Sequence, residues 1–257
     1  MTLLDADLKR MLSGYVELAS DEIEDPPEII ESVCRERTKG LSRGDHSETV
    51  TARLQDEWYR SLESGSPDYS VYDTFGYVVE AWACWVVHAR RYLKLIRTLD
   101  LEDVRSVVDV GCGVGYSTAA LKQMFPHAIV VGTQLEGKQA RIARRLAKEH
   151  EFILHVGTLD ELDHADIVFA SEYFEHFDRP VEHLREIEAA LSPKMVFSAS
   201  AFGQRAIGHF PEYVVDEKTL GGRATASAFG RETRKLGFQK IKTSWWNERP
   251  KYYRKPS

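Results

Sequence analysis

Hydrophobic positions follow two different periods along this chain. Up to about residue 100 the period is helical, and Leu4, Leu8, Leu12 and Val16 fall on one face of a first helix. The dipeptide Pro26-Pro27 interrupts that pattern. Further helices are expected over residues 28–37, 48–62 and 69–99, the last of them rich in aromatic residues. The first hundred residues therefore predict a helical region.

After residue 100, short β-rich runs alternate with helical ones. Strands are expected over residues 104–110, 128–132, 152–156, 166–170, 194–200, 237–246 and 251–255. Helices are expected over residues 118–124, 138–150 and 180–191, and within 219–236. This alternation predicts an α/β fold with a seven-stranded, mostly parallel, doubly wound sheet and helices on both faces. We expect two domains, an N-terminal helical cap or substrate region (1–100) and a sheet domain (101–257).

Composition narrows the class of protein. The chain has 257 residues, of which 43% are hydrophobic, enough for one large α/β domain and an added element. Its longest apolar stretch, Ala81–Val87, is far shorter than the ~20 residues of a membrane span. The N-terminus has no apolar signal core, so a cytoplasmic protein without membrane contact is expected. Three scattered cysteines form no CxxC pair, which indicates neither a metal site nor a disulfide framework.

Charge is distributed unevenly around a net value of −6. Residues 1–60 hold 14 acids and 8 bases, whereas residues 231–257 hold 9 bases and 2 acids. The two ends could pack against each other. Alternatively, the basic tail, interleaved with Trp245, Trp246, Tyr252 and Tyr253, could contact a nucleic acid. The third interpretation is a solvated face on terminal strands.

The first expected strand runs into a glycine-rich turn, Asp109-Val110-Gly111-Cys112-Gly113-Val114-Gly115. Ligands of open parallel sheets bind at the carboxyl ends of strands, and glycines let the backbone approach them closely. A dinucleotide fingerprint would need glycine at position 116, where Tyr116 stands. A tight turn without a ligand is the alternative interpretation.

An acid two residues before three closely spaced glycines resembles the first motif of class I S-adenosylmethionine-dependent methyltransferases. The resemblance covers about residues 105–240 and implies a Rossmann-like domain with S-adenosylmethionine as cofactor. It further implies that this turn contacts the cofactor. The implied contacts are Asp109, Gly111, Cys112, Gly113 and Gly115.

The same resemblance places the nucleoside after the second and third strands. The family's ribose-binding acid is replaced here by Gln134, whose amide can donate and accept, although Glu136 could substitute for it. Leu135 and Leu159 are expected to cover the adenine faces, unless they are core leucines. Thr158 occupies the position near the adenine amino group where the family often has an acid, with Asp160 or backbone as alternatives.

The fourth expected strand leads into Ser171-Glu172-Tyr173-Phe174-Glu175-His176, similar to the family's stretch at the cofactor–substrate junction. Ser171 is expected to line the cofactor site, Glu172 to act at the junction and Tyr173 to face the substrate. His176 is either a general base or a buttress of the turn.

Methyl transfer from a sulfonium needs a positioned nucleophile and no obligatory triad. The segment after the fourth strand lacks an Asn/Asp-Pro-Pro-aromatic motif, the chain has no Pro-Cys pair, and acids do not cluster after the fifth strand. These absences disfavour methylation of bases in DNA and catechol-type metal sites. We therefore expect a small-molecule substrate, lined also by Tyr72, Tyr77 and His209. A nucleic-acid enzyme using the basic tail and a cofactor-binding module without turnover are the alternatives, and the oligomeric state is open.

Overall fold

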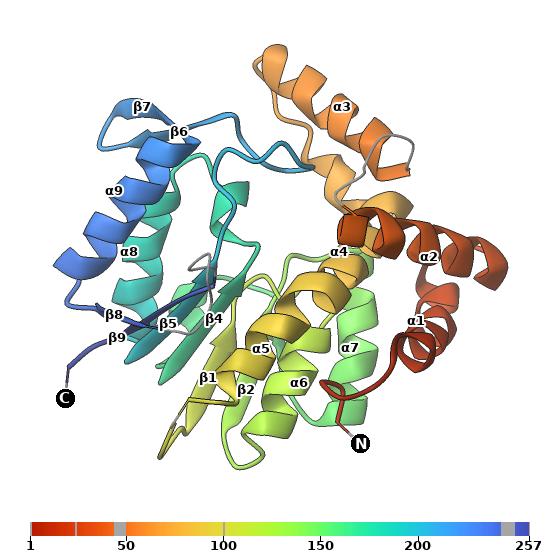
Figure 1. Cartoon of the computed structure of the whole chain (residues 1–257), viewed down its shortest axis with the longest axis horizontal. Coiled ribbons are helices and arrows are strands. Elements are labelled where there is room, and N and C mark those ends of the chain that lie inside the picture. The colour runs from red at the N-terminus through yellow and green to blue at the C-terminus, as the bar shows by residue number, and fades with distance from the viewer. Residues whose placement is uncertain (1, 24, 44–49, 100, 243–249, 257) are drawn as a thin grey trace.

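The computed structural model describes residues 2–23, 25–43, 50–99, 101–242 and 250–256. Its main sheet has seven strands in the order β3-β2-β1-β4-β5-β9-β8 (Figure 1). The strands are β1 (Ser106–Asp109), β2 (Ile129–Thr133), β3 (Ile153–His155), β4 (Ile167–Ser171), β5 (Met195–Ala199), β8 (Gln239–Ile241) and β9 (Lys251–Arg254). Strands β1 to β5 pair in parallel, whereas β9 is antiparallel to both β5 and β8. The predicted seven-stranded, mostly parallel sheet is confirmed.

Strand order reverses beside β1. The chain passes from β1 to β2 and β3 on one side and then returns to β4 and β5 on the other. Asp109 at the end of β1 lies in register with Phe169 of β4. The carboxyl ends of β1 and β4 therefore flank the topological switch point, where ligands of open α/β sheets bind.

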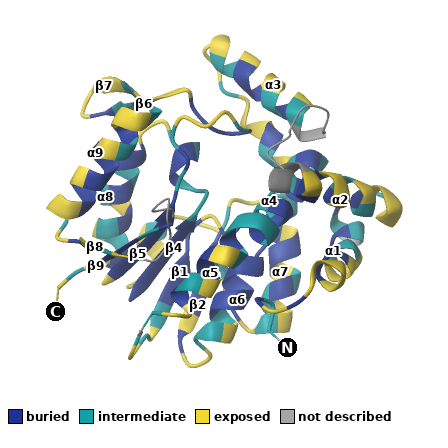
Figure 2. Ribbon diagram, in the orientation of Figure 1, coloured by how far each residue is buried: buried dark blue, intermediate teal, exposed yellow. Residues whose placement is uncertain are grey.

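Helices cover both faces of the sheet, as predicted. Alternate strand residues enter two different cores, because successive side chains of a strand point to opposite faces. Val107 packs in the core that α6 and α7 share with the N-terminal helices, and its neighbour Val108 packs in the core beneath α8 and α9. These helices are α6 (Tyr116–Met124), α7 (Lys138–His150), α8 (Pro180–Leu191) and α9 (Gly222–Lys235). Figure 2 shows the strands as a buried layer between helices with exposed outer faces.

The N-terminal helices pack on the α6–α7 side of the sheet. They are α1 (Leu8–Ile23), α2 (Pro27–Arg43), α3 (Val50–Glu63), α4 (Phe75–Cys84) and α5 (Arg90–Ile96), with the short turns η1 (Tyr69–Asp73) and η2 (Trp85–Ala89). Tyr15 of α1 stacks on Trp82 of α4 with ring centroids 5.0 Å apart. Figure 1 shows α3 beyond the carboxyl ends of the strands, opposite the hairpin of β6 (Glu212–Val215) and β7 (Lys218–Gly221).

The long aromatic helix expected over residues 69–99 is only partly right. It runs from α4 to α5 without a break, but η2 in its middle is a π-helical turn. Tyr69–Asp73 form a separate 3₁₀ turn, because Thr74 caps α4 by accepting a hydrogen bond from the Tyr77 N–H (3.3 Å). Single π turns occur mostly at functional sites.

A second, two-stranded sheet was not predicted. Strands β6 (Glu212–Val215) and β7 (Lys218–Gly221) form a hairpin whose turn residues, Asp216 and Glu217, have φ of +47° and +62°. Such a turn usually contains Asn or Gly, so these two acids give no hairpin signal.

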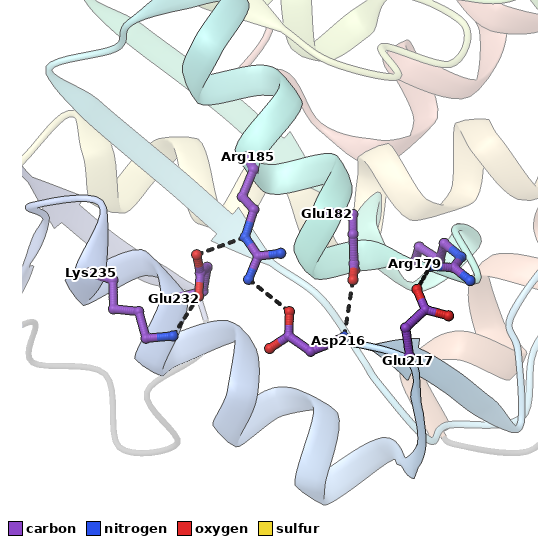
Figure 3. A network of polar contacts seen from close by, with 7 residues as sticks. All are labelled: Arg179, Glu182, Arg185, Asp216, Glu217, Glu232 and Lys235. Carbon is purple, nitrogen blue, oxygen red and sulfur yellow. Dashed lines mark hydrogen bonds and ion pairs between the residues drawn. The ribbon is translucent and has the colours of Figure 1, made fainter.

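A polar network holds this hairpin against α8 and α9 (Figure 3). At its centre Arg185 donates to Glu232 (2.7 Å) and Asp216 (3.1 Å). The other members are Arg179, Glu182, Glu217 and Lys235. The network fixes the end of the 200–211 loop, because the hairpin follows that loop directly.

Among the residues that the structure describes, no helix has both the length and the apolar character needed to cross a bilayer.

Candidate active site

A cavity of about 1220 Å³ lies at the carboxyl ends of β1, β2 and β4. Pockets for single small ligands commonly measure about 300–1,000 Å³, so this one has room for two. Every predicted site residue except Gly115 lines it. Those residues are Tyr72, Tyr77, Asp109, Gly111, Cys112, Gly113, Gln134, Leu135, Thr158, Leu159, Ser171, Glu172, Tyr173, His176 and His209.

The glycine turn forms the floor of the cavity. Gly111 and Gly113 have φ of +66° and +57°, a region that residues with a side chain rarely adopt. A Cβ atom on Gly111 would overlap the ring of Tyr173. The Gly111 N–H donates to Oγ1 of Thr133 (3.2 Å), which fastens the turn to the end of β2.

Gly115 is the one residue of the glycine turn that was predicted as a cofactor contact and does not line the cavity. It precedes α6 with φ of +90°, and a Cβ there would lie 3.2 Å from Cα of Ala143 and 3.3 Å from Phe152. This glycine lets α6 pack closely on α7 and lies off the cavity wall. The geometry therefore gives Gly115 a role in helix packing, and the cofactor contact stays a prediction.

Asp109 is buried beneath the turn, with 2% of its surface exposed. Its Oδ2 accepts hydrogen bonds from Ser117 Oγ (2.6 Å) and Thr118 Oγ1 (2.7 Å), which fix the first turn of α6. Burial raises the pKa of Asp109 to about 7, although both hydroxyl groups oppose that rise. A cationic ligand nearby would favour the ionised carboxylate.

The ends of β2 and β3 form the predicted nucleoside side of the cavity. Gln134 accepts a hydrogen bond from the Leu135 N–H (2.8 Å), so its amide stabilises its own turn while lining the cavity. Leu135 is 76% exposed. Its side chain is therefore available to cover an adenine ring. Arg144 of α7 holds the carboxylate of Glu136 (2.8 Å), the alternative to Gln134. Thr158 donates to Glu161 (3.2 Å).

Glu172 lies at the end of β4 in a strained conformation, with φ of +50°. Its N–H donates to the Ala199 carbonyl (2.7 Å), and its Oε1 accepts from the Tyr92 hydroxyl (3.2 Å). Such strain costs of order 1–3 kcal/mol and occurs most often at functional sites. Tyr92 lies shortly after the π turn. Its hydrogen bond therefore links that turn to the strained Glu172.

His176 lies between η1 and the 200–211 loop. Its Nδ1 is 3.2 Å from the Tyr72 hydroxyl, and its ring is edge-on to His209 with centroids 4.9 Å apart. Burial, with the nearby His209, lowers the pKa of His176 to about 3. The imidazole is therefore neutral near pH 7 and bridges two elements around the cavity.

Several cavity residues were not predicted. Arg37 of α2 and Glu80 of α4 form an ion pair whose side chains are 9% and 14% exposed. Cys84, Trp85 and His88 continue the same helix face into the π turn. The spacing of positions 77, 80, 84 and 88 could have indicated that face, because residues three and four apart are neighbours on a helix. Nothing in the sequence indicates that Arg37 would meet it.

The basic C-terminal tail offers fewer aromatic side chains than predicted. Tyr252 and Tyr253 of β9 are buried, and the Tyr252 hydroxyl donates to the Tyr92 carbonyl (3.2 Å). They are core residues that cannot stack on bases, which corrects that part of the nucleic-acid hypothesis. Trp245 and Trp246 lie outside the described residues.

Comparison with known sequences points to one family. Residues 108–198 match the family model of a methyltransferase domain. Trans-aconitate 2-methyltransferase from Rhodopseudomonas palustris strain BisB18 is 32% identical over 100 residues, covering 38% of this chain and 39% of the relative. Malonyl-[acyl-carrier protein] O-methyltransferase from Halalkalibacterium halodurans is 23% identical over 134 residues, covering 46% and 49%. The chain thus matches less than half the length of each relative.

Solved structures share the fold. An O-methyltransferase family protein from Burkholderia thailandensis superposes with a TM-score of 0.54 at 12% identity, covering 80% of this chain and 70% of that one. The mitomycin 7-O-methyltransferase MmcR superposes with a TM-score of 0.51 at 17% identity, covering 79% and 68%. Strand order, glycine turn and family match agree: residues 108–198 are similar to a methyltransferase domain and lie in a Rossmann-like sheet.

Proposed function

We propose that this protein transfers a methyl group from S-adenosylmethionine to a small or medium-sized acceptor. One continuous cavity joins the glycine turn to an aromatic chamber beneath the N-terminal helices, and this observation carries the proposal. One ligand alone would leave much of that volume empty. Two ligands meeting near Glu172 would use both halves.

The residues present fit the cofactor. Gly113 lines the cavity without a side chain, and the carboxylates of Asp109 and Glu172 suit a ligand with ammonium and sulfonium charges. Gln134, Leu135, Thr158 and Leu159 would hold the nucleoside. Ser171 and Glu172 would lie at the methionine end. When bound, the cofactor supplies an electrophilic methyl group.

The remaining chemistry belongs to the chain itself. Tyr72, Tyr77 and Trp85 form an aromatic wall that would exclude water from the reacting groups. His176 and His209 hold the 200–211 loop beside that wall, and the Trp58 N–H donates to the His209 carbonyl (2.8 Å). Residues 1–100 would act as a cap over the cofactor and orient the acceptor.

Isothermal titration with S-adenosylmethionine and S-adenosylhomocysteine tests the proposal. We expect both to bind the wild-type protein, and a supplied acceptor to yield S-adenosylhomocysteine. Binding without turnover on any acceptor would favour a cofactor-binding module. Absence of binding would refute the proposal.

A further inference from the structure

We propose that the acceptor is an uncharged aromatic hydroxyl compound, and that the site rejects small polycarboxylates. This inference rests on the proposed methyl transfer and concerns the half of the cavity between η1, α4 and the 200–211 loop, here called the acceptor chamber. In the reaction, the acceptor oxygen would bond the methyl carbon as the sulfur–carbon bond breaks. The electron pair of the sulfur–carbon bond would remain on sulfur, and the hydroxyl proton would pass to solvent.

Acidic side chains are more numerous than basic ones around the cavity. Among the described residues that line it, acids outnumber lysines and arginines by eight to three. The acids are Asp73, Glu80, Asp109, Glu136, Asp160, Glu172, Asp178 and Glu186. Such a wall suits the cationic methyl donor, whereas a polycarboxylate acceptor would be repelled by it.

The basic side chains are already engaged or lie elsewhere. Arg37 is neutralised by Glu80 in a nearly buried pair. Arg205 at the rim binds Asp56 (3.2 Å) and lies over the Tyr59 ring, 4.1 Å from its centroid. Lys138 begins α7, and its backbone N–H donates to Asp73 of η1 (2.6 Å). An acceptor carboxylate would have to displace Glu80 from Arg37, leaving a buried carboxylate uncompensated.

The walls of the acceptor chamber are aromatic. Tyr72 meets Tyr77 edge-on with centroids 4.7 Å apart, and Tyr69 stacks on Tyr72 at 6.2 Å. Aromatic rings prefer edge-on or offset contacts with further rings. Ala81, Cys84 and Ile207 complete the lining with small or apolar side chains. A flat, uncharged ring system fits this chamber.

Most of the acceptor chamber lies outside the segment that matches the methyltransferase family. That segment covers residues 108–198, whereas Arg37, the 69–84 wall and the 204–209 loop lie outside it. The family match over residues 108–198 therefore carries little information on the acceptor.

Two matched probes, naphthol and hydroxynaphthoate, test this inference because they differ by one carboxylate. Titrations use the full chain saturated with S-adenosylhomocysteine, whose own binding is measured first. We expect naphthol to bind at least about tenfold more tightly than hydroxynaphthoate. Glu80→Gln should strengthen hydroxynaphthoate binding about tenfold relative to naphthol binding, because it frees Arg37. Glu149→Gln, which removes an exposed acid on α7, is the control and should change neither affinity.

The outcomes separate the two proposals. If S-adenosylhomocysteine fails to bind, the proposed function fails and this inference with it. If it binds but naphthol does not, or the two probes bind equally, the inference alone is overturned. Methylation of trans-aconitate by the wild-type protein would overturn it directly.

Discussion

Replacing Asp109 with asparagine should change how stability depends on pH. The carboxylate is buried, and its neighbours Ser117 and Thr118 donate hydrogen bonds to a single oxygen. Asparagine keeps an oxygen that can accept both bonds but never becomes charged. Asp109→Asn therefore removes the cost of a buried charge and retains the contacts that begin α6.

The magnitude follows from the pKa of Asp109. Burial raises it from 3.8 to about 7 in the folded chain. Between these values the folded protein holds a proton that the unfolded chain has lost, so the free energy of unfolding falls as pH rises through this window. Each pKa unit corresponds to about 1.4 kcal/mol, which gives a loss of about 4 kcal/mol by pH 8. The variant should lack this loss.

Urea unfolding followed by circular dichroism at pH 4.5 and pH 8 measures the effect. Relative to wild type, Asp109→Asn should gain stability between the two pH values by roughly 3–4 kcal/mol. Glu149→Asn, at an exposed acid, is the control and should shift little. An equal difference between variant and wild type at both pH values would refute the reasoning, because Asp109 would then not hold a proton in the fold.

Three further predictions follow from the site and the hairpin. Gly113→Val should abolish S-adenosylhomocysteine binding in a titration, because a branched side chain at φ +57° strains the turn and projects from the cavity wall. The control is Gly14→Val in α1, where no other atom lies close, and this variant should bind normally. The pH profile of turnover should show no ionisation of His176 between pH 5 and 7, because its pKa is about 3; a step near pH 6.5 that His176→Ala removes would contradict the buried neutral imidazole. Arg185→Met should lower the free energy of unfolding, measured in urea, by about 1 kcal/mol. Arg179→Met, at a more exposed ion pair, should have almost no effect. Equal losses of stability in the two variants would argue against a stabilising network centred on Arg185.

The sequence predicted the elements that depend on local periodicity. The bounds of α7 and α8 match the expected ranges, because each has a continuous apolar stripe and begins beside a glycine or a proline. The prediction of one helix over residues 69–99 was less accurate at its start, where the Thr74 cap separates the 3₁₀ turn η1 from α4. The β6–β7 hairpin was missed because its turn is stabilised by contacts with α8 and α9.

The site residues also divide into those that local sequence patterns predict and those that only tertiary contacts bring to the cavity. Those on the glycine turn and at the ends of β1, β2 and β4 were predictable, because parallel strands place their carboxyl ends together. Arg37 was not, because it reaches the cavity from α2, a helix far away in the sequence. The packing role of Gly115 was not predicted, because a glycine needed for close helix packing and one needed for ligand approach look alike in sequence.

The sequence alone determined the layered α/β fold and the resemblance of the turn after Asp109 to a methyltransferase motif, since these depend on periodicity and a local motif. Only the tertiary structure decided how the acceptor chamber is built. Its charge and shape depend on the ion pair between α2 and α4, on the π turn and on the loop before the hairpin. These contacts join residues distant in the chain, and their free energies depend on burial, which no local pattern specifies.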